Sequence, residues 1–325
     1  MKNKADSEQA SLVINGENRA EHLEVTGFIK FRNTHGYLNA EQYPFLKYYP
    51  FMTLVYIGLL STWLLLLKKY QDQLINLHYY VLAIIMISFF ECVFNWSLYS
   101  FINRKGRYST GITLICMLIE IFRSTFARVV TLVVALGYGI LIKTIERYQN
   151  KILSVSFLYM ASLAAYNGIM YINHSSPVSG PVAMIVSFPL SILNTFFGFW
   201  IYSAFKRTLH YLGQKEQTYK FNIISKLFVC TCICLLASFM LVILDIIAAL
   251  TYSRDTDWTI MWAWESSWFW IFTLFVMSII VILKPDEKSA MLVEMQEILD
   301  ETLTEMPTEE RGDIGNTIED GVQMH

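Results

Sequence analysis

Seven long runs of apolar residues follow one another along the chain, with short polar stretches between them. They cover residues 45–67, 77–102, 110–142, 152–172, 178–205, 222–252 and 260–284. An α-helix crosses the roughly 30 Å hydrocarbon core of a bilayer with about 20 residues, and each run is long enough to do so. The pattern therefore predicts an all-α integral membrane protein, a bundle of seven transmembrane helices in which neighbours along the chain pack antiparallel.

The composition agrees with this interpretation, because 54% of the residues are hydrophobic and only 16% are charged. All five cysteines fall inside the predicted helices: Cys92, Cys116, Cys230, Cys232 and Cys234. The last three cannot share one helix face, so we expect these residues to act as small apolar side chains rather than as ligands of a metal cluster. We expect no metal site and no cofactor.

Basic residues gather in alternate connections between the runs. The connections after the first, third and fifth runs carry Lys68, Lys69, Lys143, Arg147, Lys151, Lys206, Arg207, Lys215 and Lys220. Cytoplasmic loops of membrane proteins are enriched in lysine and arginine. We therefore expect a luminal or extracellular N-terminus and a cytoplasmic C-terminus.

Three parts are expected along the chain: a polar N-terminal segment and interfacial lead-in at 1–44, the seven-helix bundle at 45–285, and an acidic cytoplasmic tail at 286–325. The tail holds twelve acidic residues against Lys288 and Arg311, a net charge of −10. Apolar residues recur in its first half at helical spacing, which predicts an acidic amphipathic helix that could dock onto a partner, such as a trafficking adaptor, or onto the basic loops. The end of the tail has the composition of a disordered segment.

The third apolar run carries three charged residues well inside it, Glu120, Arg123 and Arg128. At about 100° per residue they fall on one face of a helix, and Phe122 and Phe126 fall on the opposite face. Charged side chains inside a membrane are costly and face the bundle interior or water. This face is the strongest indication of a functional site in the sequence.

Other predicted helices carry polar residues that can meet this face. Ser88, Glu91 and Asn95 form one stripe in the second run, Asp245 lies in the sixth, and Glu265 lies among tryptophans at the start of the seventh. We expect them in the luminal half of the bundle, around a ligand or ion cavity lined by Glu91, Asn95, Glu120, Arg123, Arg128, Asp245 and Glu265. Acids outnumber arginines by two in this set, which favours a hydrated cavity for a lipid headgroup or a cation. A buried polar network that only sets helix register is the alternative.

Four stretches of the sequence resemble a known family: Thr34-His-Gly-Tyr-Leu-Asn-Ala-Glu, Phe90-Glu91, Arg123-Ser-Thr-Phe-Ala-Arg128 with Leu136-Gly-Tyr-Gly139, and Trp268-Phe-Trp with Leu283-Lys-Pro285. They resemble the lung seven-transmembrane receptor family, also called the GOLD-domain seven-transmembrane proteins, which are related to Wntless. The resemblance covers roughly residues 28–290. In that family a large luminal β-sandwich GOLD domain precedes the first helix, whereas residues 1–44 stand there in this sequence, so we expect that domain to be absent here.

The resemblance implies a multi-pass protein of Golgi or endosomal membranes, with the plasma membrane as a further location. It implies a role in protein trafficking and Golgi homeostasis, with a membrane phospholipid held in a cavity of the helix bundle. Some members have been proposed as cation channels, so a cation channel or a proton-handling protein that uses the intramembrane acids is the alternative. We expect no nucleic-acid partner, and the oligomeric state is left open.

Two further classes fit the sequence less well. Glu146-Arg147-Tyr148 is reminiscent of G-protein-coupled receptors of the rhodopsin type, but the sixth run has no Cys-Trp-x-Pro and the seventh has no Asn-Pro-x-x-Tyr. An enzyme is not expected, because His78, His174 and His210 all fall at helix ends or in loops rather than at membrane depth.

Overall fold

A computed structural model describes residues 8–9, 28–29, 32–71, 74–137, 146–175, 180–214, 218–251 and 258–285. Within this part the chain forms seven α-helices: α1 Phe45–Lys69, α2 Asn76–Lys105, α3 Thr110–Ala135, α4 Glu146–Ser175, α5 Gly180–Gln214, α6 Thr218–Thr251 and α7 Trp258–Ile282. Two short strands, β1 Glu8–Gln9 and β2 Phe28–Ile29, pair antiparallel ahead of α1. The prediction of seven helices is confirmed.

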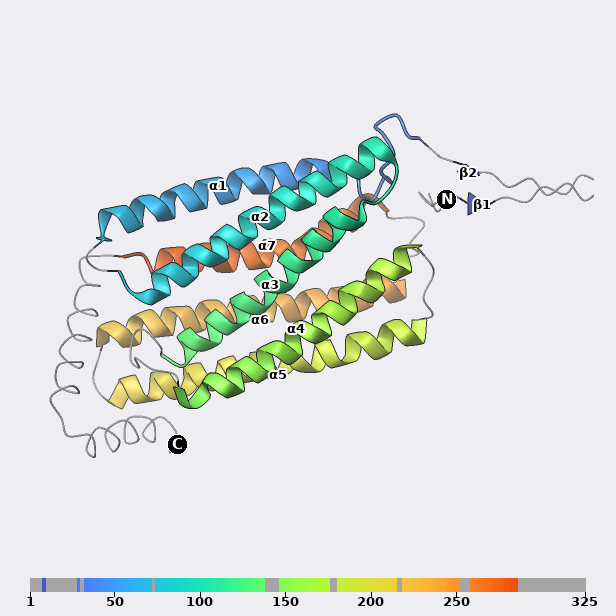
Figure 1. The fold of residues 1–325 in the computed structure, drawn as a ribbon. Helices are drawn as coiled ribbons and strands as arrows, with labels where there is room; N and C mark the ends of the chain where they lie inside the picture. Colours follow the sequence, from blue (N-terminus) through green and yellow to red (C-terminus); the bar gives the residue numbers. More distant parts are fainter. Residues whose placement is uncertain are drawn as a thin grey trace, which may run out of the picture.

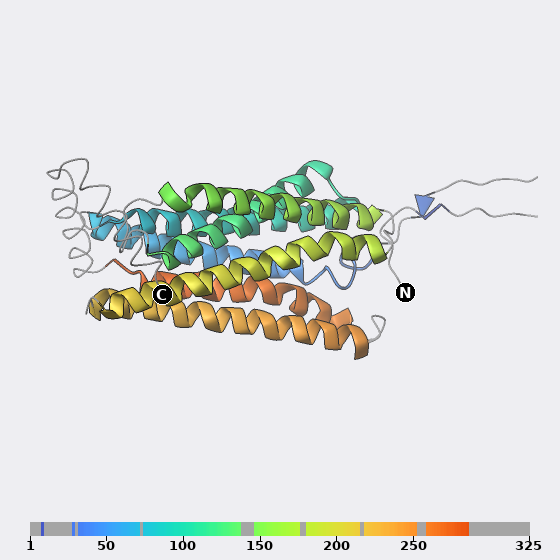
Figure 2. The same ribbon diagram turned by 90° about the horizontal axis from the view of Figure 1, so that it is seen from below.

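The helices run back and forth along a common axis to form one elongated bundle (Figures 1 and 2). By length and composition, five described stretches are apolar enough to cross a membrane: Phe45–Lys69, Asn76–Lys105, Gln149–Ile169, Ile185–Gln214 and Thr218–Leu244. In α7 the apolar stretch is shorter, Ser266–Ile282. The predicted tail at 286–325 and the side chains of Asp245 and Glu265 lie outside the described residues.

Helix α3 ends earlier than the apolar pattern predicted. The run extends to residue 142, but α3 stops at Ala135, and the N–H of Leu136 donates to the carbonyl of Leu132. Gly137 then has a φ of 84°, in the left-handed region that glycine adopts readily and that commonly closes a helix. The apolar run in the sequence continues past Gly137. Hydropathy reports only whether side chains are apolar, so it does not detect the backbone change that ends the helix.

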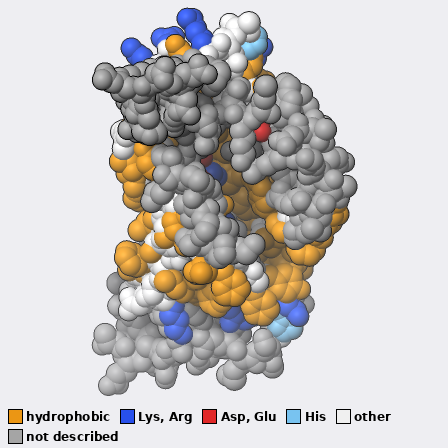
Figure 3. All heavy atoms as spheres, turned by 90° about the vertical axis from the view of Figure 1, so that its right-hand side faces the viewer, with side chains coloured by type: hydrophobic (Ala, Val, Ile, Leu, Met, Phe, Trp, Pro, Cys, Tyr) orange, Lys and Arg blue, Asp and Glu red, His pale blue; other side chains and the backbone are white. Residues whose placement is uncertain are grey.

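Two groups of helices pack within the bundle. α2 packs against α1, α3 and α7, whereas α5 packs against α3, α4 and α6. Met52, Tyr56 and Trp63 of α1 are completely buried, and Trp63 donates to the carbonyl of His78 of α2 at 3.2 Å. Seen from the end at which α1 begins, most of the described side chains between the upper and lower margins are hydrophobic, and lysine and arginine gather at those two margins (Figure 3).

The segment before α1 is fastened to the end of α2. The Asn103 side chain donates to the carbonyl of His35 at 3.0 Å, and the N–H of Tyr37 donates to the Asn103 carbonyl at 3.1 Å. Gly36 has a φ of 131°, and a Cβ there would collide with Asn103. Leu38 is buried against Ile102 of α2. The lead-in is therefore a packed cap on one end of the bundle.

Candidate functional site

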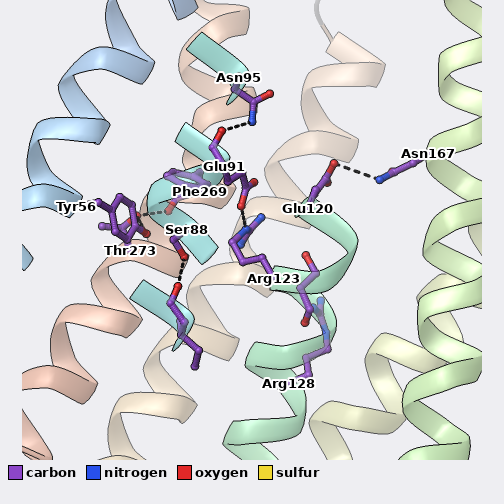
Figure 4. Close-up of polar contacts among 12 residues, drawn as sticks. Tyr56, Ser88, Glu91, Asn95, Glu120, Arg123, Arg128, Asn167, Phe269 and Thr273 are labelled. Carbon is purple, nitrogen blue, oxygen red and sulfur yellow. Dashed lines mark hydrogen bonds and ion pairs between the residues drawn. The ribbon is translucent and has the colours of Figure 1, made fainter. Parts of the chain in front are cut away.

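The centre of the site is an ion pair between two neighbouring helices. Glu91 Oε2 of α2 forms an ion pair with Arg123 Nε of α3, and the two side chains are only 6% and 12% exposed (Figure 4). The Arg123 guanidinium also lies 5.3 Å from the ring centroid of Phe269 and 4.5 Å from that of Phe272, both on α7. Ion pairing and cation–π attraction therefore hold this arginine between α2 and α7.

The polar stripe of α2 is only partly directed at this pair. Ser88 and Glu91 are buried, as the stripe predicts. Ser88 donates to the carbonyl of Ile84 at 2.8 Å, and the Asn95 amide donates to the backbone carbonyl of Glu91 at 3.0 Å. Glu91 is thus the residue of the stripe whose side chain reaches the charged face of α3, while Ser88 and Asn95 bond to their own helix.

Glu120, one turn before Arg123, has a different partner. The Asn167 amide of α4 donates to Glu120 Oε2 at 3.2 Å (Figure 4). Among the side chains that the structure describes, no arginine or lysine forms an ion pair with this carboxylate. Glu120 is half-buried, so part of its carboxylate is open to water or ions. Its described protein partner is the neutral amide of Asn167.

Arg128, further along α3, is held by neutral groups from three helices. Its Nη1 donates to the Ser124 carbonyl of α3 at 2.9 Å, and its Nη2 donates to Asn194 Oδ1 of α5 at 2.8 Å. The guanidinium lies 4.5 Å from the ring centroid of Tyr159 of α4. Within the described part of the chain it has no carboxylate partner.

In the structure, the charged residues of α3 therefore make three separate contacts. Arg123 pairs with Glu91 of α2, Glu120 contacts Asn167 of α4, and Arg128 contacts Tyr159 of α4 and Asn194 of α5. Of the predicted cavity residues, those with described charged side chains are two acids, Glu91 and Glu120, and two arginines, Arg123 and Arg128. The predicted surplus of acid depends on Asp245 and Glu265, whose side chains lie outside the described part.

Several partners were missed by sequence reasoning. They are Tyr159, Asn167, Asn194, Phe269 and Phe272. Asn167 is a lone amide in an apolar run and is a signal that could have been used, as is Asn194 with the serines around it. The aromatic residues carry no such signal, because an aromatic side chain in an apolar helix is ordinary.

Buried hydroxyl groups surround the network. Tyr56 of α1 and Thr273 of α7 share a hydrogen bond of 3.0 Å. Three other buried hydroxyls, those of Tyr48, Thr125 and Ser156, have no hydrogen-bond partner among the described residues. Thr125 lies one turn before Arg128 on α3, and Ser156 lies one turn before Tyr159 on α4. Polar groups of this kind are usually satisfied by water or ligand.

Comparison of the sequence with models of known protein families identifies the family to which the chain belongs. The model of the GOST seven-transmembrane domain matches residues 44–290, the whole bundle and the start of the tail. This chain belongs to the GOST seven-transmembrane family. The resemblance of the sequence to the GOLD-domain seven-transmembrane proteins is thereby confirmed, and the chain is a multi-pass membrane protein with a seven-transmembrane domain.

Individual relatives agree with the family assignment. The chain is 23% identical to transmembrane protein 87A of Xenopus tropicalis over 269 residues, which cover 83% of this chain and 49% of the relative. It is 24% identical to transmembrane protein 87B of Mus musculus over 251 residues, 77% of this chain and 45% of the relative. Membrane protein PTM1 of Saccharomyces cerevisiae is 24% identical over 283 residues. The chain spans about half the length of these relatives.

Proposed function

We propose that this GOST-family chain acts in membrane-protein trafficking and Golgi homeostasis in Golgi or endosomal membranes. We further propose that it binds the headgroup of a membrane phospholipid in a hydrated cavity lined by the charged face of α3. The family and the multi-pass architecture support the first part. The second part rests on Arg128.

Arg128 carries the proposal because none of its contacts in the described part of the chain brings a negative charge. Asn194 and the Ser124 carbonyl accept hydrogen bonds but bring no negative charge, and the Tyr159 ring supplies only a quadrupole. A guanidinium in a low-dielectric setting is stabilised most by an anion that accepts two or more of its donors. A phosphate headgroup has this geometry and is abundant in the surrounding bilayer.

The unpaired hydroxyls of Thr125 and Ser156 support the same reading. They lie on α3 and α4, two of the three helices that hold Arg128, and they are buried without a described partner. Hydroxyl groups donate readily to phosphate oxygens. A headgroup beside Arg128, directly or through water, would satisfy hydroxyl donors that have no partner among the described residues.

The test is to compare bound phospholipid in the purified full chain and in Arg128→Gln. Loss of a charge-assisted hydrogen bond is expected to lower retention about tenfold, measured by native mass spectrometry with quantification of extracted lipid. Arg128→Lys keeps the charge and is the matched control, expected to retain more lipid than Arg128→Gln. Equal lipid content in all three proteins would refute the proposal that Arg128 binds a phospholipid headgroup.

The location needs its own experiment. The full chain carrying a small C-terminal tag is expected to co-localise with Golgi or endosomal markers in fixed cells. Depletion of the protein is expected to alter Golgi morphology and the arrival of membrane cargo. Residence in another compartment with normal cargo transport would contradict the trafficking role and leave the lipid experiment unaffected.

A cation channel or proton-handling protein remains the second candidate because of one observation. The Glu120 carboxylate is held by a neutral amide and not by an arginine in the described part of the chain. A carboxylate of this kind attracts a cation or a proton. Current through reconstituted bilayers distinguishes this activity from lipid binding.

A further inference from the structure

A long groove follows the outer face of α5 towards its C-terminal end, away from the charged face of α3. Its volume is about 1110 Å³. Phe196, Phe199 and Trp200 line one half of it, and Lys206, Arg207 and His210 line the other half. These residues recur at helical spacing, so the groove is one continuous stripe of α5. The buried residues Phe197, Ile201 and Phe205 point to the other side of the helix.

The order of apolar and basic residues along the groove matches the order of groups in a phospholipid. Phe196 and Arg207 are separated by about 16 Å along the helix axis at 1.5 Å per residue. This length is close to half the hydrocarbon thickness of about 30 Å. With Arg207 at the level of the headgroups, the aromatic wall therefore lies at the depth of the acyl chains of the same leaflet.

The apolar wall is open to its surroundings rather than packed. Phe199 is 70% exposed and Phe196 is 47% exposed, whereas Phe197 on the opposite side of the helix is 1% exposed. Phe221 from the start of α6 closes the groove near its basic end. A surface of this size and shape, set beside lysine and arginine, fits an amphiphile better than a soluble anion.

The described side chains at the basic end of the groove carry positive charge. Lys206 is exposed, and Arg207 donates from Nε to the Ser203 carbonyl of its own helix at 3.4 Å. His210 contacts Gln214 at 3.2 Å. Among the described residues that line the groove there is no aspartate or glutamate. Basic pockets at the ends of transmembrane helices are typical sites for anionic headgroups.

We propose that this groove binds an anionic phospholipid from the leaflet at the C-terminal end of α5. Its acyl chains lie along Phe196, Phe199 and Trp200, and its phosphate lies against Lys206, Arg207 and His210. The site is separate from Arg128, which is bonded to Asn194 and to Tyr159 between α3, α4 and α5. It does not depend on the function proposed above.

The experiment uses the full chain in phosphatidylcholine nanodiscs that contain a minor fraction of phosphatidylserine. The ratio of the two lipids that stay bound after extraction is measured by quantitative lipid mass spectrometry. The double variant Lys206→Gln and Arg207→Gln is expected to lower the preference for phosphatidylserine about tenfold. The control is Lys68→Gln with Lys69→Gln, which removes the same charge from the C-terminal end of α1 outside the groove. It is expected to change the ratio less than about twofold.

Two outcomes of this comparison would overturn the proposal. Retention of the full phosphatidylserine preference in the α5 variant shows that the groove is not the site. An equal loss in the α1 control shows that the effect comes from the general charge of this end of the bundle and not from a built groove.

An apolar variant tests whether the occupant is a lipid. Phe199→Ala is expected to lower bound phosphatidylserine about threefold, because one wall of the acyl-chain site is removed. Phe157→Ala on α4 is the matched control: Phe157 is 66% exposed, lies outside the groove, and its loss should leave the ratio unchanged. Displacement of phosphatidylserine by inorganic phosphate would instead identify a site for soluble anions and would overturn the proposal.

The acidic tail of the chain is the other candidate occupant of the groove. The full chain with Glu294→Gln and Glu297→Gln tests this alternative. These substitutions reduce the negative charge of residues 286–325, which is −10. If the lipid is the occupant, the phosphatidylserine ratio stays the same. A severalfold rise would show that the tail normally fills the groove, and the lipid proposal would be wrong.

Discussion

Two arginines stand five residues apart on α3 and have opposite surroundings. Arg123 faces α2 and α7, where Glu91 neutralises its charge and two phenylalanine rings cover it. Arg128 faces α4 and α5, where its described partners, Asn194 and Tyr159, are both neutral. Within the described part of the chain, the same residue type on the same helix is thus paired with a carboxylate on one side of the bundle and held by neutral groups on the other.

The two sides also differ in how far their helices are buried. In the most apolar stretch of α2, 39% of the residues are buried inside the protein, whereas the corresponding share is 11% in α5 and in α6. A helix that buries little against protein must be covered by lipid. The share in α1 is 22%, between these values. We call the α1, α2 and α7 side, which holds the ion pair and the most buried helix, the closed side, and the α5 and α6 side, which exposes more of its apolar surface, the open side.

The largest expected effect is that of Glu91→Ala, which leaves the Arg123 charge unpaired on the closed side. We expect a loss of about 3–5 kcal/mol in the free energy of unfolding, because breaking a buried ion pair strands one charge. The loss is measured by titration of the purified full chain with SDS in mixed micelles.

The double variant Glu91→Gln with Arg123→Gln is the control for this prediction, since it removes both charges at once. It is expected to be more stable than Glu91→Ala. Equal instability of the two variants would show that packing around the pair, and not its charge, sets the stability of the closed side.

A smaller effect is expected for Tyr56→Phe, which removes a buried hydroxyl on the closed side. Tyr56 is 0% exposed and bonds to Thr273 at 3.0 Å, so we expect a loss of about 1 kcal/mol in the same titration. Tyr202→Phe on α5 is the matched control on the open side, because Tyr202 is 44% exposed, and its stability should not change. A larger loss for Tyr202→Phe would reverse the assignment of the two sides.

The smallest effect on stability is expected for Glu120→Gln. Glutamine keeps an oxygen that can accept from Asn167, so the change should be about 0.5 kcal/mol or less. Current across a bilayer that contains the purified protein is the sensitive measurement. Unchanged current in Glu120→Gln would remove this residue from any cation path, whereas loss of current in a stable protein would favour the channel over the lipid receptor.

The fold could be predicted from the sequence because each membrane-spanning helix makes its backbone hydrogen bonds within its own segment. Such a segment can therefore be recognised from local hydropathy alone. All seven predicted runs correspond to helices, and the charged face of α3 points into the bundle, with Ala127 and Thr131 buried and Phe122 58% exposed. The end of α3 could not be predicted from hydropathy, because it is set by the left-handed backbone of Gly137.

The membership in the GOST family, the seven helices and the candidate charges were determined by the sequence alone. Only the tertiary structure decided which charges meet. Glu120 is the acid nearest to Arg123 along α3, at a spacing that allows a pair within one helix. Arg123 nevertheless binds Glu91 of α2, and Glu120 binds Asn167 of α4. The reason is that each sector of a helix faces a different neighbour, and helix packing, not local sequence, sets which neighbour that is.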